Sequence, residues 1–316
     1  MAKQRKNLTK TRTFNIALKV VWILVLILLI LSLVKSCAVC NFRAHIVDKT
    51  GYLPDNEDWN NIPDVQPPYN DDDTLNLPEK VMLEHLFPPI GDQGEKGTCV
   101  VWATGYNLKT ALNAIDSGWS ATMLENPARQ TSPKDLWFNI PQDQKGSGCS
   151  GTGFESAFNA LKDKGAASMA TVPYQDLQNC TGTGVGDSNN RILNYYQVVS
   201  DGNLPTVGQL KSYIADTIPL VFGARLGDRF MRWHNDNVIA HDTYNYTGMH
   251  AYHAMTLVGY DDSRHAFRVR NSWGTRWGDE GSIWVDYNYF CNEFCYVVLM
   301  AETHTSDSSH NNNQPR

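Results

Sequence analysis

The chain has 316 residues, of which 42% are hydrophobic and 19% charged, and its formal net charge is −6. This composition excludes wholesale disorder, and the length suits one mid-sized domain with appendages or two small domains. Six basic residues and no acid occur before residue 20. The remaining chain is acidic and lacks the basic stripe that contacts nucleic-acid phosphates, so we expect no nucleic-acid partner.

An apolar run follows the basic cluster. Residues 20–34 are apolar except for Ser32, and the run extends back to residue 14 if Lys19 snorkels. That length is enough for a helix to cross a lipid bilayer, and the basic cluster should remain in the cytosol. We predict a basic cytosolic stretch over residues 1–13 and a single-pass transmembrane signal anchor over residues 14–35. The bulk of the protein is then extracytoplasmic, in the periplasm or outside the cell.

Two other interpretations of the N-terminus remain open. A cleaved signal peptide also has an apolar segment after a basic one, and residues 34–37 (VKSC) resemble a lipoprotein processing site. Both alternatives export the remainder of the chain. The number of cysteines is seven, and an odd number leaves at least one thiol unpaired within the molecule in an oxidising compartment.

The chain beyond the apolar run divides into three parts. Residues 36–79 are rich in Pro, Asn and Asp without helical or strand period, which predicts a flexible linker or a short prosegment. Residues 80–303 are expected to form the folded domain, and the polar residues 304–316 a disordered tail.

The two halves of the domain have different patterns. Helical signals occupy residues 99–115, 132–138 and 153–164, with Thr98 as the expected N-cap of the first helix and Pro133 at the first position of the second. Strand signals follow at residues 220–222, 254–260, 266–270, 282–285 and 296–300. Helices followed by antiparallel strands predict an α+β fold of two subdomains with a cleft between them.

Cys99 is the candidate nucleophile. A cysteine beside an apolar helix is more often buried and inert, but this one lies at the helix start, where free N–H groups and the helix dipole stabilise a thiolate. Gly94 and Gly97 allow a tight turn before it. Gln93, six residues upstream, could donate to a developing oxyanion together with the backbone N–H of Cys99, although one such glutamine is weak evidence.

A base and its orienting group come from the strand half. His253 opens a strand, from which its ring can face a nucleophile on the other subdomain. His250 competes for this role, but it precedes the strand and should be less rigidly held. The carbonyl of Asn271 could accept a hydrogen bond from the imidazole, and Trp273 would shield that bond from water. The alternative for residues 271–281 is a glycine-rich turn with packing tryptophans.

Five segments of the chain resemble the papain/cathepsin family of cysteine peptidases. They are residues 91–103 (GDQGEKGTCVVWA), 148–151 (GCSG), 172–174 (VPY), 253–260 (HAMTLVGY) and 271–278 (NSWGTRWG), in family order over about residues 80–302. The resemblance implies a papain-like fold with a helical left lobe and an antiparallel β-rich right lobe. It also implies that the substrate is a peptide or protein and that no cofactor is needed.

The resemblance implies a role for each site residue. Cys99 would be the nucleophile, His253 its base, Asn271 the orienting residue and Gln93 part of the oxyanion hole. Substrate-binding roles would fall to Gly151, Thr152 and Trp273. Gly151 would form hydrogen bonds with the substrate backbone, and Thr152, which stands where the family often has a glycine, would narrow the pocket. Trp273 would cover the catalytic Asn271.

The departures from the family concern the cysteines and the linker. Lys96 stands where the family often has a half-cystine. Cys149 matches the cysteine to which that half-cystine is usually bonded, so Cys149 needs a different partner. Cys180 is the best candidate for that partner. Cys291 and Cys295 are expected to pair with each other; metal binding is the alternative, but no His or second thiol pair accompanies them. No long helical prosegment precedes the domain: either activity is controlled differently or residues 36–79 lie in the cleft.

We therefore expect an exported, membrane-tethered cysteine peptidase that acts through a thioester acyl-enzyme. One alternative is a catalytically silent papain-like domain used for binding or adhesion. Another is a peptidoglycan-cleaving Cys/His hydrolase, which would not need the segment NSWG. The expected partners are the substrate and, through the N-terminal helix, the lipid bilayer; the oligomeric state is left open.

Overall fold

The computed structural model describes residues 21–29, 50–54, 58–67, 76–175, 177, 179–243 and 251–303. The chain divides into two compact units, Met1–Ile46 and Val47–Arg316. In the first unit residues 21–29 are helical, and no helix within the described ranges is both long and apolar enough to span a bilayer. The predicted segments 1–13 and 304–316, most of 14–35, and His250 lie outside the described residues.

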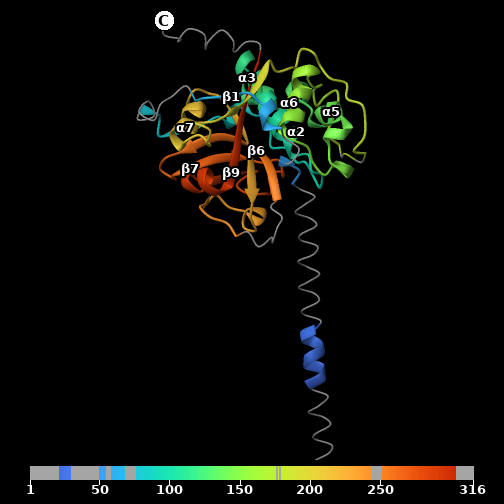
Figure 1. Ribbon diagram of the computed structural model, residues 1–316, viewed down its shortest axis with the longest axis vertical. Helices are drawn as coiled ribbons and strands as arrows, with labels where there is room; N and C mark the ends of the chain where they lie inside the picture. The colour runs from blue at the N-terminus through green and yellow to red at the C-terminus, as the bar shows by residue number, and fades with distance from the viewer. Residues whose placement is uncertain are drawn as a thin grey trace, which may run out of the picture. The chain divides into compact units, whose positions relative to one another are not determined.

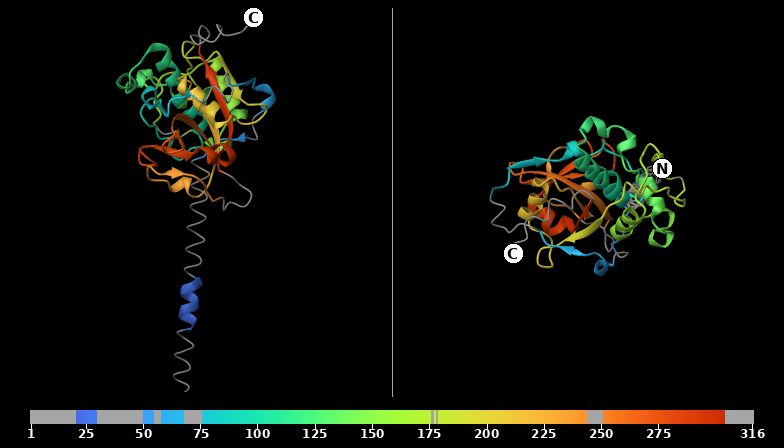
Figure 2. Two further views of the ribbon diagram at one scale, coloured as in Figure 1. Left: turned by 90° about the vertical axis from the view of Figure 1, so that its left-hand side faces the viewer. Right: turned by 90° about the horizontal axis from the view of Figure 1, so that it is seen from above.

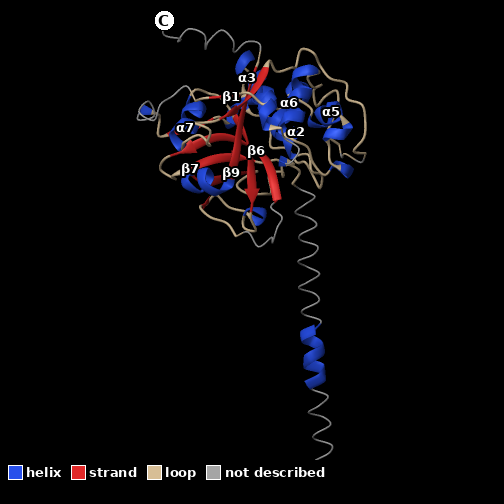
Figure 3. Ribbon diagram, viewed as in Figure 1, coloured by secondary structure: helices blue, strands red, loops and turns tan. Residues whose placement is uncertain are grey.

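The helices and the strands of the second unit form two neighbouring groups. Figure 1 shows α5 and α6 in green on the right and β6, β7 and β9 in orange and red on the left. The view from above in Figure 2 shows the same separation, and Figure 3 distinguishes the helices from the strands. The α and π helices are α2 (Cys99–Val101), η5 (Trp102–Lys109), α3 (Thr110–Ser117), α4 (Ala121–Leu124), α5 (Pro133–Asn139), α6 (Phe154–Asp163), α7 (Val207–Ala215), α8 (Tyr287–Tyr289) and η10 (Phe290–Phe294). Single turns of 3₁₀ helix are η2 (Trp59–Asn61), η4 (Glu84–Leu86), η6 (Pro127–Arg129), η7 (Gln142–Gln144), η8 (Ser147–Cys149) and η9 (Phe230–Arg232).

The helix predicted over residues 99–115 is confirmed as a continuous helical stretch through α2, η5 and α3. Its middle part, η5, is a π-helix, a rare form with wider turns. Gly118 ends the stretch with a left-handed φ of 62°. Thr98 precedes it but makes no capping hydrogen bond; its hydroxyl lies 2.9 Å from the hydroxyl of Tyr174. The capping prediction is wrong because a side chain distant in sequence takes that hydroxyl.

The next two predicted helices are also present. Ser132 caps α5 by accepting a hydrogen bond from the backbone N–H of Asp135, and Pro133 occupies the first turn. α6 buries Phe154, Phe158 and Leu161, the apolar face expected from the sequence. These side chains belong to a core cluster that also contains Cys99, so the candidate nucleophile sits on a packed helix.

The strands form one sheet in the order β1-β3-β9-β4-β6-β7-β8-β5, with β2 paired to β6. β6 pairs antiparallel with β4 and β7, whereas β1 pairs with β3 and β5 with β8 in parallel. All five predicted strands are present. The strands are β1 (Asp64–Val65), β2 (Lys80–Met82), β3 (Asn194–Val198), β4 (Leu220–Leu226), β5 (Val238–Ile239), β6 (Ala251–Asp261), β7 (Ala266–Arg270), β8 (Ser282–Asp286) and β9 (Cys295–Glu302).

Part of the region expected to be a linker packs against this domain. β1 joins the sheet edge beside β3, and Ile62 and Tyr52 are buried among core residues. β1 pairs with Gln197 and Val198 of β3, and the Tyr52 ring packs against the rings of Phe154 and Tyr296, all more than 100 residues away in the chain. Contacts of that range leave no local period in a sequence.

One predicted disulfide is confirmed and the other is wrong. Cys149 and Cys180 are bonded, with Cα atoms 5.1 Å apart. Cys291 and Cys295 are free thiols. Cys291 lies in η10, with its sulfur 4.0 Å from the Pro205 carbonyl oxygen. Cys295 begins β9 and directs its sulfur to the Val297 carbonyl oxygen at 3.5 Å. The change from helix to strand directs the two sulfurs to different neighbours.

Candidate active site

Cys99 begins α2 at the end of a glycine-containing loop. Gly94 in that loop has a φ of 66°, a conformation that favours glycine. The Gly97 N–H donates to the Cys149 carbonyl oxygen at 2.8 Å, which ties the loop to the disulfide. The Cys99 side chain is fully buried, and its sulfur accepts a hydrogen bond from the Ala254 N–H at 3.5 Å. The nucleophile candidate therefore lies beside the residue that directly follows His253.

His253 and Asn271 form the pair expected from the sequence. His253 lies on β6 opposite Ala224 of β4, and its Nε2 is 2.7 Å from Asn271 Oδ1. Since an amide oxygen only accepts, Nε2 carries the proton of this bond. Nδ1 is buried and has no hydrogen-bond partner among the described residues. The ring is thus anchored at one nitrogen while the other is available to take a proton.

Trp273 covers this pair. Its ring lies 4.7 Å from the His253 ring, measured between centroids, and it packs edge-on against Phe230 and Trp277. Asn271 itself follows β7, and its Oδ1 also accepts from the Ser272 N–H at 2.8 Å. The aromatic cover excludes water from the His253–Asn271 bond, which strengthens it.

The protonation of the two groups follows from their burial. Burial raises the pKa of the Cys99 thiol to about 12. Hydrogen bonds from the backbone N–H groups of Ala254, Gly51 and Val100 lower this pKa, but their effect is smaller. Burial also lowers the pKa of His253 to about 4, although the bond to Asn271 acts in the opposite direction. The sequence predicted a lowered thiol pKa at the helix start. That prediction is wrong for this conformation, because loss of water outweighs the helix N-terminus and leaves both groups neutral.

Gln93 is buried in the loop before the nucleophile. Its Nε2 donates to the Lys96 carbonyl oxygen at 2.7 Å, and its Oε1 accepts from the Ser272 hydroxyl at 2.7 Å. Its backbone N–H also donates to the Ser272 carbonyl oxygen at 2.8 Å. Gln93 therefore connects the loop of Cys99 to the loop of Asn271, and Lys96 takes one of the two N–H donors of its amide.

The predicted substrate-binding residues lie next to the nucleophile loop. Gly151 has a φ of 145°, and Thr152 is fully buried with its hydroxyl donating to the Gln144 carbonyl oxygen at 2.9 Å. The backbone of Thr152 is bonded to residues 51 and 53 of this same chain. Those two residues could not be recognised beforehand, because they lie in the irregular stretch at 36–79.

Tyr174 is a second residue whose contribution the sequence left unassigned. Its hydroxyl donates to the Gln93 carbonyl oxygen at 3.0 Å and lies 2.9 Å from the Thr98 hydroxyl. Its ring meets the ring of Trp102 edge-on at 4.7 Å. Tyr174 thereby holds both ends of the loop that precedes Cys99. Its position in the segment VPY, one of the five that resemble the family, was the sequence feature that could have identified this role.

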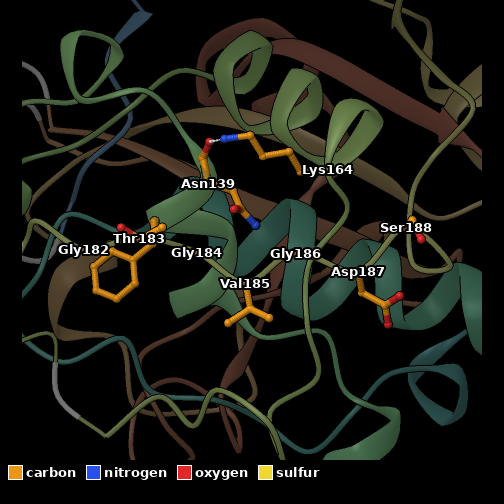
Figure 4. Close-up of a pocket in the computed structure, with 10 residues that line it drawn as sticks. Asn139, Lys164, Gly182, Thr183, Gly184, Val185, Gly186, Asp187 and Ser188 are labelled. Atoms are coloured by element: carbon orange, nitrogen blue, oxygen red, sulfur yellow. Dashed lines mark hydrogen bonds between the residues drawn. The ribbon is translucent and has the colours of Figure 1, made fainter.

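A separate hollow of about 500 Å³ lies on the helical side and is lined by the glycine-rich residues 182–188 with Phe138, Asn139 and Lys164 (Figure 4). The backbone N–H groups of Val185 and Gly186 donate to the buried Asp135 carboxylate, so they are not available to a ligand. Among the described residues no group of His, Cys, Asp and Glu is suited to hold a metal ion.

Comparison with known proteins agrees with this geometry. Residues 83–301 match the family described as papain family cysteine protease. The cysteine endopeptidase Rep1 of Oryza sativa is 27% identical over 201 residues, which cover 61% of this chain and 48% of the relative. Peptidase 1 of Dermatophagoides farinae is 26% identical, covering 72% of this chain and 67% of the relative. The chain thus spans about half to two thirds of the length of these relatives.

Solved structures show the same fold. Xylellain, a cysteine protease from Xylella fastidiosa, superimposes with a TM-score of 0.64 at 23% identity, covering 81% of this chain and 96% of that one. Digestive procathepsin L 3 of the Tenebrio molitor larval midgut gives 0.62 at 19% identity, covering 83% and 78%. The predicted papain-like α+β fold is therefore confirmed, and the chain belongs to the papain family of cysteine proteases.

Proposed function

We propose that the chain hydrolyses peptide bonds, with Cys99 as nucleophile, His253 as base and Asn271 as the residue that orients the base. One observation carries this proposal. His253 is held at Nε2 by Asn271 at 2.7 Å and has an unpartnered Nδ1, while the Cys99 sulfur lies against the backbone of the next residue, Ala254. A nucleophile, a base and a group that orients the base are the parts needed for acyl transfer.

The reaction proceeds through a thioester. His253 Nδ1 takes the thiol proton and the sulfur attacks the substrate carbonyl carbon, giving a tetrahedral oxyanion. The Cys99 backbone N–H and the Gln93 amide stabilise that oxyanion. The C–N bond then breaks, the imidazolium gives its proton to the leaving amine, and a thioester remains. His253 next deprotonates a water molecule, which hydrolyses the thioester and restores the thiol.

Replacing the nucleophile tests this proposal. Cys99→Ala is expected to abolish peptide hydrolysis, with a fall in kcat of at least about 10³-fold, and to abolish labelling by a thiol-directed peptide electrophile. Cys291→Ala removes another free thiol and is expected to leave both unchanged. Hydrolysis that continues in Cys99→Ala would exclude this nucleophile.

A binding domain without turnover is the second candidate. The observation that favours it is that Cys99 and His253 are both fully buried, so a substrate cannot reach them in this conformation. Electrophile labelling separates the two candidates, because a silent domain with this geometry would neither react at Cys99 nor release cleaved peptide.

We infer further that residues 14–35 anchor the protein in a membrane with the peptidase domain on the extracytoplasmic side. The apolar run and the basic residues before it support this topology, and the Cys149–Cys180 disulfide fits an oxidising compartment. Protease added outside intact cells is expected to digest residues 80–303. Digestion only from the cytosolic side of sealed vesicles would show the reverse topology.

A further inference from the structure

A second hollow, of about 270 Å³, lies at the C-terminal end of the helical stretch that begins at Cys99. It is lined by residues of α3 and η6 and by residues 187–190. Cys99 and Asn113 of α3 are 14 residues apart in this stretch, which corresponds to a distance on the order of 20 Å along a helix. Asp187 lines both this hollow and the larger one of Figure 4. The proposed peptidase chemistry uses no residue of the second hollow.

The lining of this hollow, here termed the amide hollow, is almost entirely polar. The side chains used below are Asn113, Trp119, Arg129, Asp187, Asn189 and Asn190. Among the described residues that line it, Trp119 and Ala128 are the only apolar ones, so an apolar ligand would find few partners. Arg129 and Asp187 contribute one charge of each sign. The composition therefore favours a ligand that is neutral and polar.

The orientation of two amides in the hollow follows from their partners. Lys109 is 2% exposed and donates from Nζ to Oδ1 of Asn113. Burial lowers the pKa of Lys109 to about 8, which leaves an ammonium group at pH 7, and such a group can only donate. Nδ2 of Asn113 consequently faces Asn190 and donates to its Oδ1 at 2.8 Å. Nδ2 of Asn190 donates to Oγ1 of Thr131 at 3.1 Å and to the Ala166 carbonyl oxygen at 2.7 Å.

This network leaves one donor and one acceptor side by side. Nδ2 of Asn113 has a second N–H, and Oδ1 of Asn190 has a second lone pair. The two atoms are 2.8 Å apart and both side chains are half-buried in the lining. Adjacent hydroxyl groups of a sugar ring match this pair, because one hydroxyl can accept from the amide N–H while its neighbour donates to the amide oxygen. The buried partners Lys109 and Thr131 fix both amides before a ligand arrives.

Trp119 supplies a flat apolar surface in the same hollow. Its ring is half-buried, and Cζ of Arg129 lies 5.5 Å from the ring centroid, a cation–π contact that holds the ring in place. The Trp119 backbone N–H donates to the Ala114 carbonyl oxygen at 2.9 Å. The C–H face of a pyranose ring is apolar and packs on an aromatic ring of this kind. Trp119 therefore offers a stacking surface to a ligand whose hydroxyls reach the amides.

The loop of residues 187–190 forms a fixed rim. The Asn189 N–H donates to Oδ1 of Asp187 at 2.9 Å, and the Asp187 N–H donates to the Lys164 carbonyl oxygen at 3.1 Å. Gly165 lies beneath the loop with a φ of 68°, and a Cβ at that position would collide with the Asp187 carbonyl oxygen. The side chain of Asn189 is exposed on this rim. A ligand thus meets a preformed edge as well as a preformed floor.

We propose that the amide hollow binds one ring of a neutral oligosaccharide, with the ring against Trp119 and two adjacent hydroxyls on Asn113 and Asn190. This inference goes beyond the proposed peptidase function and does not depend on it. A saccharide bound here lies away from Cys99, so it leaves the peptidase site free for a peptide. Cys99→Ala is accordingly expected to bind the saccharide as the parent does.

The first experiment measures ligand binding to the full chain, kept soluble with a sugar-free detergent, by saturation-transfer NMR. The probes are chitotriose, maltotriose and mannotriose, with adenosine as a neutral ligand that also stacks on aromatic rings. At least one trisaccharide is expected to bind with a Kd below about 10 mM and more tightly than adenosine. Absence of binding by all three trisaccharides, or tighter binding of adenosine, would overturn the saccharide assignment.

Two variants then locate the site through different atoms. Trp119→Ala removes the stacking surface and is expected to weaken trisaccharide binding by at least about tenfold. Asn113→Asp keeps the bond from Lys109 but loses the donor, and is expected to weaken binding about 3- to 10-fold.

The matched controls are Trp59→Ala, a half-buried tryptophan outside the hollow, and Asn288→Asp, an exposed asparagine. Both should bind the trisaccharide as the parent does, with circular dichroism verifying the fold of all four variants. If Trp119→Ala and Asn113→Asp bind as tightly as these controls, the amide hollow is not the site and the proposal fails.

The source of the saccharide is distinguished by two further measurements. A glycan on a protein substrate predicts that enzymatic removal of a neutral glycan lowers kcat/KM for that protein at least about threefold in the parent and has no effect in Trp119→Ala. A polysaccharide predicts instead that the parent co-sediments with the insoluble polymer of the best trisaccharide and is released by the soluble trisaccharide. Each result supports the hollow as a saccharide site and assigns one source.

Discussion

The side chain of Asn271 shows how one residue can control the chemistry of another. Its Oδ1 holds the Nε2 proton of His253 at 2.7 Å, so the unprotonated Nδ1 is the nitrogen left to act as base. The Trp273 ring beside the imidazole keeps water from competing for this bond. The imidazole thus has a fixed tautomer and a fixed orientation before any substrate arrives.

Asn271→Ala is expected to lower kcat/KM by a factor on the order of 10 to 100, because a hydrogen bond to a group that becomes charged contributes about 1.5–3 kcal/mol. Steady-state kinetics of peptide hydrolysis by the parent and by Asn271→Ala would measure this loss. Asn288→Ala, on the exposed side of α8, is the control and should have no effect. An unchanged kcat/KM in Asn271→Ala would show that the imidazole needs no partner at Nε2.

At the scale of elements, helix α7 contacts β6 and β2 from outside the helical group. Thr206 and Gln209 form a capping box at its start, in which each side chain accepts a hydrogen bond from the other residue's backbone N–H. The cap satisfies two N–H groups that the first turn would otherwise leave without partners. α7 packs on the strand that carries His253, so its stability contributes to the support of the site.

Thr206→Ala is expected to reduce the free energy of unfolding by about 1 kcal/mol, the usual cost of a lost N-cap. Urea denaturation followed by circular dichroism would give the value. Thr183→Ala removes an exposed threonine outside any helix and serves for comparison. Equal destabilisation by the two substitutions would mean that the capping box contributes nothing specific.

The elements with local patterns were predictable from the sequence, and those with distant partners were not. The helix after Cys99 and the strand from His253 have clear periods, and the segments around Cys99, His253 and Asn271 identified the family. α7 and β3 were missed, although the residues Thr206 and Gln209 were a readable capping signal for the former. The position of residues 51–53 could not be predicted, because their backbone partners Thr152 and Tyr252 lie about 100 and 200 residues further along the chain.

The pKa of the Cys99 thiol lies in the opposite direction from the one expected at a helix start, and the reason is physical. Reasoning from the helix start considers only the N–H groups near Cys99, and these do lower the thiol pKa. Burial in the surrounding core is a tertiary effect and acts more strongly in the other direction. A sequence shows which groups are close along the chain, but it does not show which of them have lost contact with water.

At the scale of the whole molecule, the buried His253 connects folding stability to pH. Its pKa is about 4 in the folded protein and 6.5 in an exposed histidine, so between these values the unfolded chain binds more protons than the folded one. The contribution of His253 to the free energy of unfolding is therefore fully present above about pH 6.5 and is lost as the pH falls towards 4. A difference of this size corresponds to a free energy on the order of 3 kcal/mol.

Urea unfolding at pH 7 and at pH 4.5 would measure this effect. The parent should lose stability between the two pH values, and His253→Gln should lose less. His234→Gln, which replaces an exposed histidine, should lose as much as the parent. An identical loss in the parent and in His253→Gln would show that the buried imidazole is not the group responsible.

The full burial of the Cys99 sulfur also affects how well this thiol resists oxidation. Peroxide attacks thiolates that solvent can reach, whereas this sulfur is a neutral thiol with no exposed surface. A buried, neutral Cys99 thiol is therefore expected to stay reduced in the presence of peroxide. The burial that keeps substrate from Cys99 in this conformation thus also protects the sulfur from oxidation.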